Sequence, residues 1–330
     1  MYLVSNVTLT GYEQLVHTLG GHSEEILSEV GLLPVNISDS AGFVSYLRYA
    51  ELLEATAKTL NMPLFGLKLA SRHGPDLLGP LSLGFCLQKH LKQALDYLLS
   101  HAYLFAYGQI LTVKQSNGWV QVSIEYEFGD ESPLNQLRQS SCQHLYNYLT
   151  SVQVDNIGAM RIHLRQPRPP VHERHYSHVC FSADFDGVSF PAAWLTASLS
   201  AGREQMLQFV DRYMDELISN FPHSYSEQVS SVVNQLLREG QCTMTQVASV
   251  LGCGVRSLQL KLQEEGRSYS LILQECRVAL AYQLLRRKHM RVTDVAFELG
   301  FSDVSTFSRK FKSWTGVSPL QWQKEQQESW

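Results

Sequence analysis

Three polar side chains near the C-terminal end of the chain have the types and the spacing that suit contacts with DNA bases. Ser305, Thr306 and Arg309 lie at positions i, i+1 and i+4, so a helix would present them on one stripe. The planar guanidinium of an arginine can donate two hydrogen bonds to O6 and N7 of guanine, and hydroxyl side chains can meet a base edge or a phosphate. We therefore predict that Arg309 contacts a base directly, with Ser305 and Thr306 beside it.

The residues that flank this stripe suit the DNA backbone. We predict that Ser308, Lys310 and Lys312 contact phosphates, which would fix the register and add salt-dependent affinity without reading the sequence. The alternative is that Arg309 and Lys312 are ordinary solvated charges on an amphipathic helix.

A corresponding polar stripe lies earlier in the chain and consists of Arg256, Gln259 and Lys261, grouped around Leu260. We predict that Arg256 and Gln259 contact bases, since both side chains carry hydrogen-bond donors that can reach a groove. Two alternatives stay open, namely that Leu260 extends the apolar face of its helix and that Lys261 points to water.

An internal repeat supplies the elements that would position both stripes. Residues 245–252 (TQVASVLG) recur as residues 293–300 (TDVAFELG), with five of eight positions identical. Each copy predicts a short helix that begins at a capping threonine and ends at a glycine. A small alanine in each helix lets another helix cross it closely. A second apolar-periodic segment with a polar outer face follows each glycine. This order of elements is typical of the helix-turn-helix unit that places its second helix in the major groove of DNA.

The segment between the two copies predicts one continuous helix. Residues 269–287 contain no proline or glycine and carry apolar residues through at least four turns. A helix of this length extends about 28 Å, close to the ~34 Å that separates successive major-groove faces on one side of B-DNA. A single chain is therefore able to offer two recognition helices to adjacent major grooves.

The charge of the chain is unevenly distributed. The net charge of the 330 residues is −4, which is unusual for a protein that binds nucleic acid. Residues 223–330, however, carry 13 Lys and Arg against 10 Asp and Glu, a net charge of +3, and residues 1–222 carry 14 against 21, a net charge of −7. A mildly basic part behind an acidic part permits separate DNA-reading and sensing domains without demonstrating them.

The cysteines and the N-terminus bear on the cellular compartment. The six cysteines include no C-x-x-C pair, which argues against a disulfide framework and a zinc ribbon and predicts reduced, mostly buried thiols. No window is apolar for long enough to cross a bilayer, and residues 1–10 lack the features of a signal peptide. We expect a cytoplasmic protein without membrane contact and without a cofactor.

One cluster of residues could ligate a metal. His172, His175, His178 and Cys180 supply imidazole and thiolate groups within nine residues. Their spacing fits no standard site, and they follow a proline-rich run at residues 167–170 where regular helix geometry is disfavoured. The favoured interpretation is a connector without metal, and a metal sensor is kept as an alternative.

The N-terminal two thirds predict a domain of helices and a small sheet. Apolar residues recur every three or four positions from Gly21 to about Gly108, which predicts helices. Apolar and polar residues then alternate over residues 109–128, which predicts a β-hairpin that turns at Asn117-Gly118. The further elements that we predict are a helix over residues 134–152 and strands at residues 160–164 and 188–190.

The motifs resemble those of a known family. Residues 292–322 (VTDVAFELGFSDVSTFSRKFKSWTGVSPLQW) resemble the C-terminal signature of AraC-type transcription regulators, and the first repeat copy is similar but has Gly254 where a capping serine is common and Leu260 where an arginine is common. Three N-terminal segments, NMPLFGLKLA, LGPLSLGFCLQKHLKQALDYL and FPAAWL, are similar to the arabinose-binding sensor domain of a subgroup of this family. The label of that domain does not assign a ligand.

Together these features predict an α+β N-terminal domain with mixed helices and a small antiparallel sheet, followed by an all-α domain in which a linker helix joins two helix-turn-helix units. We expect residues 1–222 to sense an effector and to dimerise, and residues 223–330 to bind DNA. The resemblance implies a homodimeric, sequence-specific transcription regulator, which we take to be an activator that responds to a small molecule of unknown identity and works with RNA polymerase at promoter DNA. The candidate dimer interface, which could equally pack inside the domain, comprises Leu199, Met206, Val210, Tyr213, Met214 and Leu217.

The sequence disfavours two other functions. An enzyme fused to a DNA-binding module is disfavoured because the sequence contains no G-x-S-x-G, H-E-x-x-H, P-loop or G-x-G-x-x-G motif. A chromosome-organising protein that binds DNA without sequence preference is disfavoured by the small positive charge of the C-terminal part and by its paired recognition helices.

Overall fold

A computed structural model of the chain divides it into two compact units, which are described separately. One unit consists of Tyr2–Val30 and Val44–Phe221, and the other consists mainly of Pro222–Trp330. The residues that the structure describes are 2–32, 34, 42–74, 76–129, 134–151, 157–170, 176–197, 199, 204–219, 221–222, 224–238, 242–287 and 290–328.

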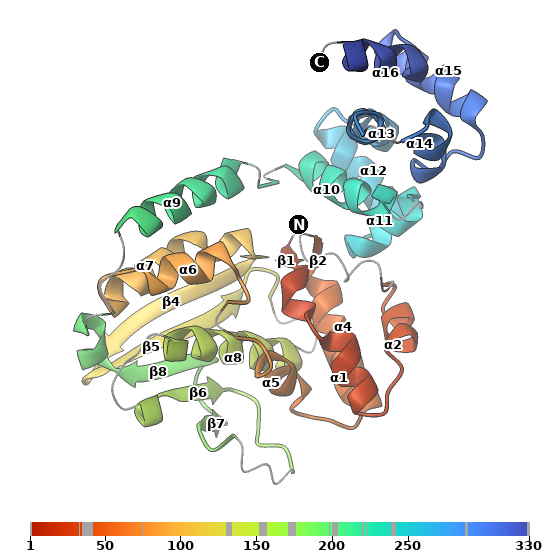
Figure 1. Cartoon of the computed structure of the whole chain (residues 1–330). Helices are drawn as coiled ribbons and strands as arrows, with labels where there is room; N and C mark the ends of the chain where they lie inside the picture. Colours follow the sequence, from red (N-terminus) through yellow and green to blue (C-terminus); the bar gives the residue numbers. More distant parts are fainter. Residues whose placement is uncertain are drawn as a thin grey trace. The chain divides into compact units, whose positions relative to one another are not determined.

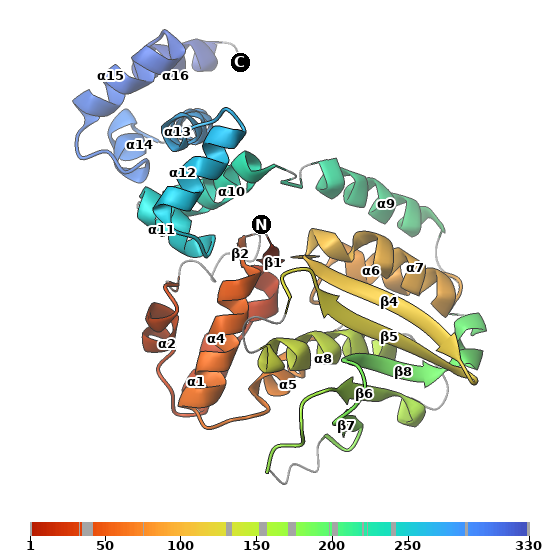
Figure 2. The same cartoon turned by 180° about the vertical axis from the view of Figure 1, so that it is seen from behind.

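The N-terminal unit is built around a five-stranded sheet (Figure 1). The strands follow the order β4-β5-β8-β6-β7, and all neighbouring pairs are antiparallel except β6 and β7, which are parallel. Figure 2 shows β5 running between β4 and β8. The strand bounds are β4 Gln109–Ser116, β5 Trp119–Tyr126, β6 Arg161–Leu164, β7 Val179–Phe181 and β8 Gly187–Pro191.

The hairpin β4–β5 turns where the sequence predicts. Asn117 and Gly118 have positive φ angles of 49° and 78°, and Ser116 pairs with Trp119 across the turn. A two-residue turn of this kind matches the twist of the flanking strands and favours Asn-Gly. The predicted hairpin is confirmed.

Helices cover one face of this sheet. The long helix α8 packs against β5, β6 and β8. Val120, Val122 and Ile124 alternate along β5 and are buried, so one face of the strand lies in the core. The predicted helices and the two predicted strands at β6 and β8 are present. The helices of this unit are α1 Tyr12–Thr18, α2 Ser23–Glu29, α4 Tyr46–Thr59, α5 Phe65–Ala70, α6 Pro80–Cys86, α7 Leu91–His101, α8 Asn135–Ser151 and α9 Glu204–Ser219.

The sequence did not predict a second, three-stranded sheet in this unit. Its order is β2-β1-β3, with β1 at Leu3–Ser5, β2 at Phe43–Ser45 and β3 at Ala106–Tyr107. The expectation of helices throughout residues 21–108 is therefore wrong at β2 and β3. Strands of two or three residues are too short to show an alternation of apolar and polar residues. They form through backbone hydrogen bonds between segments that are distant in the sequence, such as the bond that the Ser5 amide donates to the Phe105 carbonyl at 2.7 Å.

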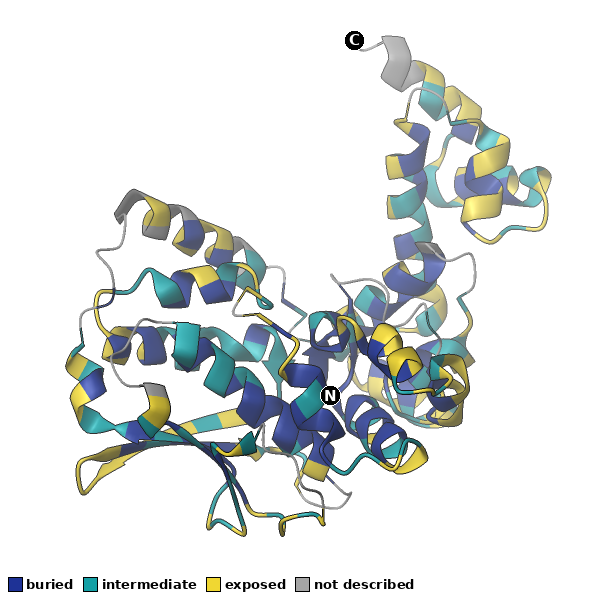
Figure 3. Ribbon diagram, turned by 60° about the horizontal axis from the view of Figure 1, so that its bottom comes forward, coloured by how far each residue is buried: buried dark blue, intermediate teal, exposed yellow. Residues whose placement is uncertain are grey.

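The C-terminal unit is all helical over its described residues, as predicted. Helix α10 packs against α11, α12 and α13, and α13 packs against α14 and α15. In Figure 3 the buried residues of these helices line the faces that meet one another. The helices are α10 Tyr225–Arg238, α11 Met244–Val250, α12 Val255–Glu264, α13 Tyr269–Leu285, α14 Val292–Glu298, α15 Val304–Thr315 and α16 Pro319–Glu328.

Both repeat copies fold as helix, turn, helix. The glycines that end α11 and α14, Gly252 and Gly300, have φ angles of 65° and 76°, a conformation that glycine adopts without steric cost. Ala248 and Ala296 are buried, which lets the second helix of each unit approach closely. The predicted pair of helix-turn-helix units is confirmed.

The caps of α11 and α14 differ from the prediction, which placed them at the repeated threonines. Thr245 and Thr293 lie inside the first turns. The hydroxyl of Thr243 instead accepts from the Gln246 amide at 3.2 Å, and Asp294 accepts from the amide of Arg291 at 3.3 Å. A cap residue must directly precede the first helical residue. The apolar periodicity located that first residue only to within one helical turn.

The linker helix α13 begins at the predicted residue. The Ser268 hydroxyl caps it by accepting from the Leu271 amide at 3.3 Å. The helix ends at Leu285, two residues before the predicted end, so its 17 residues extend about 26 Å.

The six cysteines carry free thiols, as expected, but the expectation that most of them are buried is wrong, because only Cys142 and Cys276 are buried and the other four are partly exposed. Burial raises the pKa of the Cys276 thiol to about 11. Across the described ranges, no helix is both long and apolar enough to span a membrane.

Candidate nucleic-acid interface

The second recognition helix, α15, begins at Val304, directly after Asp303. Asp303 is its cap, and the Asp303 carboxylate accepts a hydrogen bond from the Thr306 amide at 2.7 Å. Hydrogen bonds from Thr306 lower the pKa of Asp303, so the cap is ionised at neutral pH. Gly316, with a φ angle of 84°, ends the helix in the left-handed conformation.

Two aromatic side chains fix the rotation of α15. Phe307 and Phe311 are both 0% exposed. At about 100° per residue, Arg309 projects from the side opposite to this pair, and Ser305 and Lys312 project about 40° and 60° from Arg309, both toward the same edge of the outward face. All three are exposed. The structure therefore brings Ser305, Arg309 and Lys312 together on the surface, which we call the α15 face.

The remaining predicted residues of this unit lie at the edge of the α15 face. Thr306 and Ser308 are half-buried, and Lys310 is exposed but projects about 60° from the direction of Phe307. Thr306 accepts a hydrogen bond from the Arg309 guanidinium at 3.3 Å, which holds the cation along the helix surface. Thr306 thus orients Arg309, and its hydroxyl can also donate and accept hydrogen bonds of its own.

Aromatic packing supports the turn before α15. The ring of Phe301 lies 5.4 Å from that of Phe307 and 6.2 Å from that of Trp314. The guanidinium of Arg277, from α13, stands 4.9 Å from the Phe301 ring centre. Phe301, Phe307 and Trp314 therefore pack against one another at this turn.

The first recognition helix, α12, presents a different outward face. Leu258 and Leu262 are buried and take the places of Phe307 and Phe311, so Leu260 takes the place of Arg309. Leu260 is 52% exposed. The alternative that Leu260 extends the buried face of α12 is therefore wrong, because its side chain projects away from the core.

The predicted residues of the first unit are not all on that outward face. Arg256 is exposed beside Leu260 in the place that Ser305 takes on α15. Gln259 is exposed at one edge, and Lys261 lies at the other edge with its ammonium 5.2 Å from the ring centre of Tyr225. Lys261 is exposed to water and also lies over the Tyr225 ring at the start of α10, outside the central stripe.

The sequence reasoning missed Gln263. Its side chain is exposed in the place that Lys312 takes on α15, seven residues after Arg256. Arg256, Leu260 and Gln263 lie at positions i, i+4 and i+7, and this helical spacing would have placed Gln263 on the outward face. We call Arg256, Leu260 and Gln263 the α12 face.

The ends of α12 are held differently from those of α15. Gly254 precedes the helix without a side-chain cap, with a φ angle of −76° that any residue can adopt. At the other end, the Glu265 carboxylate accepts from the amides of Tyr225 and Ser226, each at 2.8 Å. These two bonds tie α12 to the start of α10 and lower the pKa of Glu265 against the effect of burial.

The two recognition helices differ in charge. Helix α15 contains Arg309, Lys310 and Lys312 and no carboxylate, whereas α12 contains Arg256 and Lys261 against Glu264. Formal charges are therefore +3 for α15 and +1 for α12. The larger positive charge of α15 predicts a stronger attraction of DNA phosphates to the second unit than to the first.

The candidate metal cluster is only partly described. His172 and His175 lie outside the described residues. His178 stacks on Tyr146 with ring centres 4.6 Å apart, and Cys180 pairs with His163 across β6 and β7. Within the part of the chain that the structure describes, no group of three or more His, Cys, Asp or Glu side chains is placed to hold a metal ion.

Comparisons with protein families match both units. The family model described as the arabinose-binding domain of AraC transcription regulators, N-terminal, matches residues 20–199, which is more than half of the chain. A model described as a helix-turn-helix domain matches residues 247–325. The second match includes α12, α13, α14 and α15.

Relatives similar over nearly their whole length are named as regulators. The HTH-type transcriptional regulator VirS of Mycobacterium tuberculosis is 25% identical over 327 residues, covering 97% of this chain and 96% of the relative. The ornithine utilization regulator of Pseudomonas aeruginosa is 24% identical over 312 residues, covering 91% and 90%. Among solved structures, that of the transcriptional regulator CdpR from Pseudomonas aeruginosa is 19% identical, covers 92% of this chain and 96% of its own, and has a TM-score of 0.40.

Proposed function

The chain belongs to the AraC family of transcription regulators, and from this premise we propose that residues 223–330 bind double-stranded promoter DNA and that residues 1–222 respond to a small-molecule effector. It is a helix-turn-helix regulator with an N-terminal ligand-binding domain. The proposal adds which residues contact DNA, how many grooves they enter and what the N-terminal domain does.

The observation that carries the proposal is the α15 face. Ser305, Arg309 and Lys312 project from the side opposite to the buried Phe307 and Phe311, so packing holds donors and cations outward. An arginine at the centre of such a face suits a guanine, and a lysine at its margin suits a phosphate. The proposed contacts are base readout by Arg309 with Ser305 and Thr306, and phosphate contacts by Ser308, Lys310 and Lys312.

The first unit contributes by different chemistry. Arg256 and Gln259 carry the base-reading donors, and the exposed Leu260 offers an apolar contact to a thymine methyl group. Lys261 contributes a phosphate contact from the edge of α12, and Gln263 extends the α12 face. Because α13 is about 26 Å long, the two recognition helices reach adjacent major grooves of one DNA face.

The N-terminal domain is proposed to dimerise and to transmit the effector signal, so that the homodimer activates transcription with RNA polymerase in the cytoplasm. Helix α9 is the candidate contact surface. Val210 and Met214 on this helix are buried, whereas Met206 and Tyr213 are 40% and 43% exposed and remain available to a second copy. The interior alternative therefore accounts for the strip of α9 that carries Val210 and Met214, and the dimer proposal uses the adjacent exposed strip that carries Met206 and Tyr213.

Selection of bound sequences from random DNA by the full-length chain at fixed, near-physiological salt tests this function. We expect enrichment of two short blocks about one helical turn, ~10 base pairs, apart. Equal recovery of all sequences would contradict sequence-specific binding. A single enriched block would contradict the use of both units.

A further inference from the structure

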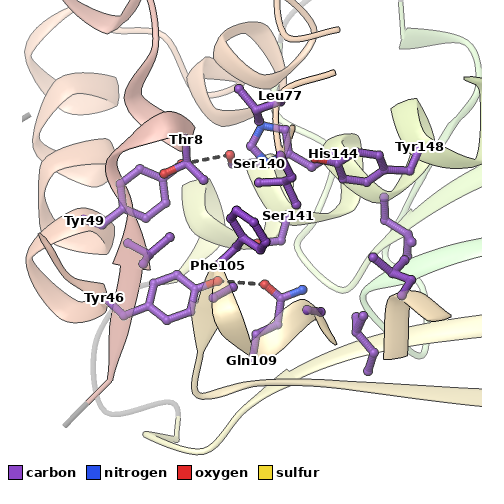
Figure 4. Close-up of a pocket in the computed structure, with 17 residues that line it drawn as sticks. Thr8, Tyr46, Tyr49, Leu77, Phe105, Gln109, Ser140, Ser141, His144 and Tyr148 are labelled. Atoms are coloured by element: carbon purple, nitrogen blue, oxygen red, sulfur yellow. Dashed lines mark hydrogen bonds between the residues drawn. The ribbon is translucent and has the colours of Figure 1, made fainter. Parts of the chain in front are cut away.

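The N-terminal unit encloses a cavity between its helices and the start of its hairpin (Figure 4). Tyr46 and Tyr49 enter it from α4, and His144 and Tyr148 enter it from α8. The lining residues all belong to the same compact unit, so the cavity does not depend on how the two units are placed.

The lining of this cavity carries no formal charge. It contains no Asp, Glu, Lys or Arg, and most of it is apolar or aromatic, including Leu98, Phe105 and Leu145. Its polar groups are the hydroxyls of serine, threonine and tyrosine, the amide of Gln109 and the imidazole of His144. An ionised ligand would find no opposite charge here, and burying an unpaired charge is costly.

The polar groups hold one another in place at two points. The Tyr46 hydroxyl donates to Oε1 of Gln109 at 2.7 Å. The hydroxyls of Tyr49 and Ser140 share a hydrogen bond of 3.1 Å. These bonds join α4 to β4 and to α8, so the polar side of the cavity is formed before any ligand arrives.

A chain of hydrogen bonds fixes the tautomer of His144. Nε2 of His73 lies 2.8 Å from the Thr10 carbonyl, which can only accept, so that nitrogen carries the proton. Nδ1 of a neutral His73 is then an acceptor, and Nε2 of His144, 2.8 Å away, must donate to it. Nδ1 of a neutral His144 is therefore unprotonated and is a hydrogen-bond acceptor on a side chain that borders the cavity.

Both imidazoles are neutral near pH 7. Burial, with the repulsion of the neighbouring His73, lowers the pKa of His144 to about 3. Burial likewise lowers the pKa of His73, against the opposing effect of its bond to Thr10. The acceptor at Nδ1 of His144 thus persists under physiological conditions.

The size of the cavity limits its ligand. Its volume is about 60 Å³, counted as the space that the centre of a water molecule can reach. This is less than the ~150 Å³ of a cavity that can hold benzene, so one six-membered ring is the upper limit for the ligand.

We propose that this cavity is the effector site and that it takes an uncharged molecule no larger than one six-membered ring, such as a phenol or a small cyclic alcohol, whose hydroxyl donates to Nδ1 of His144. The inference rests on the proposed function, in which the N-terminal domain binds a small-molecule effector. The apolar wall around Leu98 and Leu145 takes the ring, and the neutral lining excludes ionised relatives of the same size.

Calorimetric titration of the full-length chain at pH 7.5 with phenol, toluene and benzoate tests the proposed chemistry. Phenol should bind one site per chain. Toluene has the same size without the hydroxyl and should bind about tenfold more weakly, and benzoate should not bind. Equal binding of phenol and toluene, preferential binding of benzoate, or no binding of phenol would overturn the proposal.

A substitution that fills the cavity tests the location. Ala102 lines the cavity, and Ala102→Leu should abolish phenol binding without removing any polar group. Ala193→Leu, at an exposed alanine outside the lining, should leave binding unchanged. Thermal unfolding checks that both variants fold, and Ala106→Leu, also in the lining, replaces Ala102→Leu if the latter does not. Undiminished phenol binding in a folded, filled variant would place the site elsewhere and overturn the proposal.

The failure of this inference can be told apart from the failure of the proposed function. If random DNA shows enriched blocks but the filled variant still responds to phenol, or if phenol does not bind, the cavity assignment fails and the regulator stands. If no DNA sequence is enriched, the proposed function fails whatever phenol does.

Discussion

The two helix-turn-helix units share a backbone plan but carry different chemistry on their outward faces. Arg309 stands at the centre of the α15 face, and Leu260 stands at the same place on the α12 face. Helix α15 has three cations and no carboxylate, whereas α12 has two cations and one carboxylate. A repeat can thus keep the same packing while its exposed positions diverge, because the core fixes which positions face outward and not which residues fill them.

The units also differ in how they are stabilised. Phe307 and Phe311 fill the core behind α15, and Leu258 and Leu262 do so behind α12. Asp303 caps α15, while α12 starts at an uncapped Gly254 but is tied at its other end by Glu265. In the second unit the recognition helix is therefore stabilised by a cap directly before it, whereas in the first unit the recognition helix is held by hydrogen bonds to α10.

The largest expected effect comes from removing the aromatic core of the second unit. Phe307→Ala should cost about 3–5 kcal/mol of stability, since it deletes a fully buried ring and leaves a cavity. The matched change Leu258→Ala in the first unit should cost about 2–5 kcal/mol. Denaturant unfolding of the full chain measures both, and a cost under about 1 kcal/mol for Phe307→Ala would contradict the packing described.

Next in size is the loss of the central cation. Arg309→Ala should cost about 1–3 kcal/mol on the selected DNA site and relax the preference at one base pair. Lys312→Ala should weaken specific and random DNA about equally and reduce the salt dependence, as loss of a phosphate contact does. Binding isotherms on both DNAs at two salt concentrations separate the two, and equal losses for both variants would refute this division of roles.

A smaller effect should follow from converting the α12 face into the α15 kind. Leu260→Arg should add about 1 kcal/mol of discrimination in favour of guanine in the block that the first unit reads, because it restores the bidentate donor. Leu260→Ala serves as the control and should only weaken any preference for thymine in that block. Repeated selection with both variants tests this, and an unchanged motif with Leu260→Arg would mean that Leu260 does not face the DNA.

The smallest effects concern the caps. Gly254 has open space around its Cβ position and a φ angle that serine can adopt, so Gly254→Ser should stabilise the chain by a few tenths of a kcal/mol.

Asp303→Ala should lower the melting temperature at pH 7, whereas Asp303→Asn, which keeps an acceptor, should do so less.

The Asp303 effect has a predicted pH dependence. The pKa of Asp303 is lowered in the folded chain, so its stabilisation is present above the ordinary carboxyl range and is lost as the pH falls through the folded pKa. The difference in melting temperature between wild type and Asp303→Ala should therefore shrink between pH 7 and pH 2.5. A difference that grows on acidification would contradict the cap.

The sequence predicted those parts of the fold that local patterns determine. The repeat, the turn at Asn117-Gly118 and the start of α13 each depend on residues close together in the chain, so they could be found before the structure. The small sheet β2-β1-β3 could not, since its strands are two or three residues long and pair with distant segments. Strand β7 was missed for the same reason.

Helical periodicity predicted only part of how the candidate DNA-contacting side chains are placed on their helices. The periodicity placed Arg309 outward because two aromatic residues mark the inner side of α15. It could not place Lys261, whose contact with Tyr225 depends on how α10 packs, and it left Leu260 undecided because an apolar residue is usually interior. The cavity around His144 is assembled from distant segments and leaves no local pattern.

The central claim is that Arg309 reads a guanine while Leu260, at the same place on the first unit, does not. Methylation interference on the selected DNA site tests it directly, because dimethyl sulfate blocks N7 of guanine, one of the two atoms that an arginine fork contacts. We predict that methylation of one guanine, in one block only, prevents binding of the wild-type chain and has no further effect on Arg309→Ala. If that guanine remains sensitive in Arg309→Ala, or if no guanine is sensitive, the claim is contradicted.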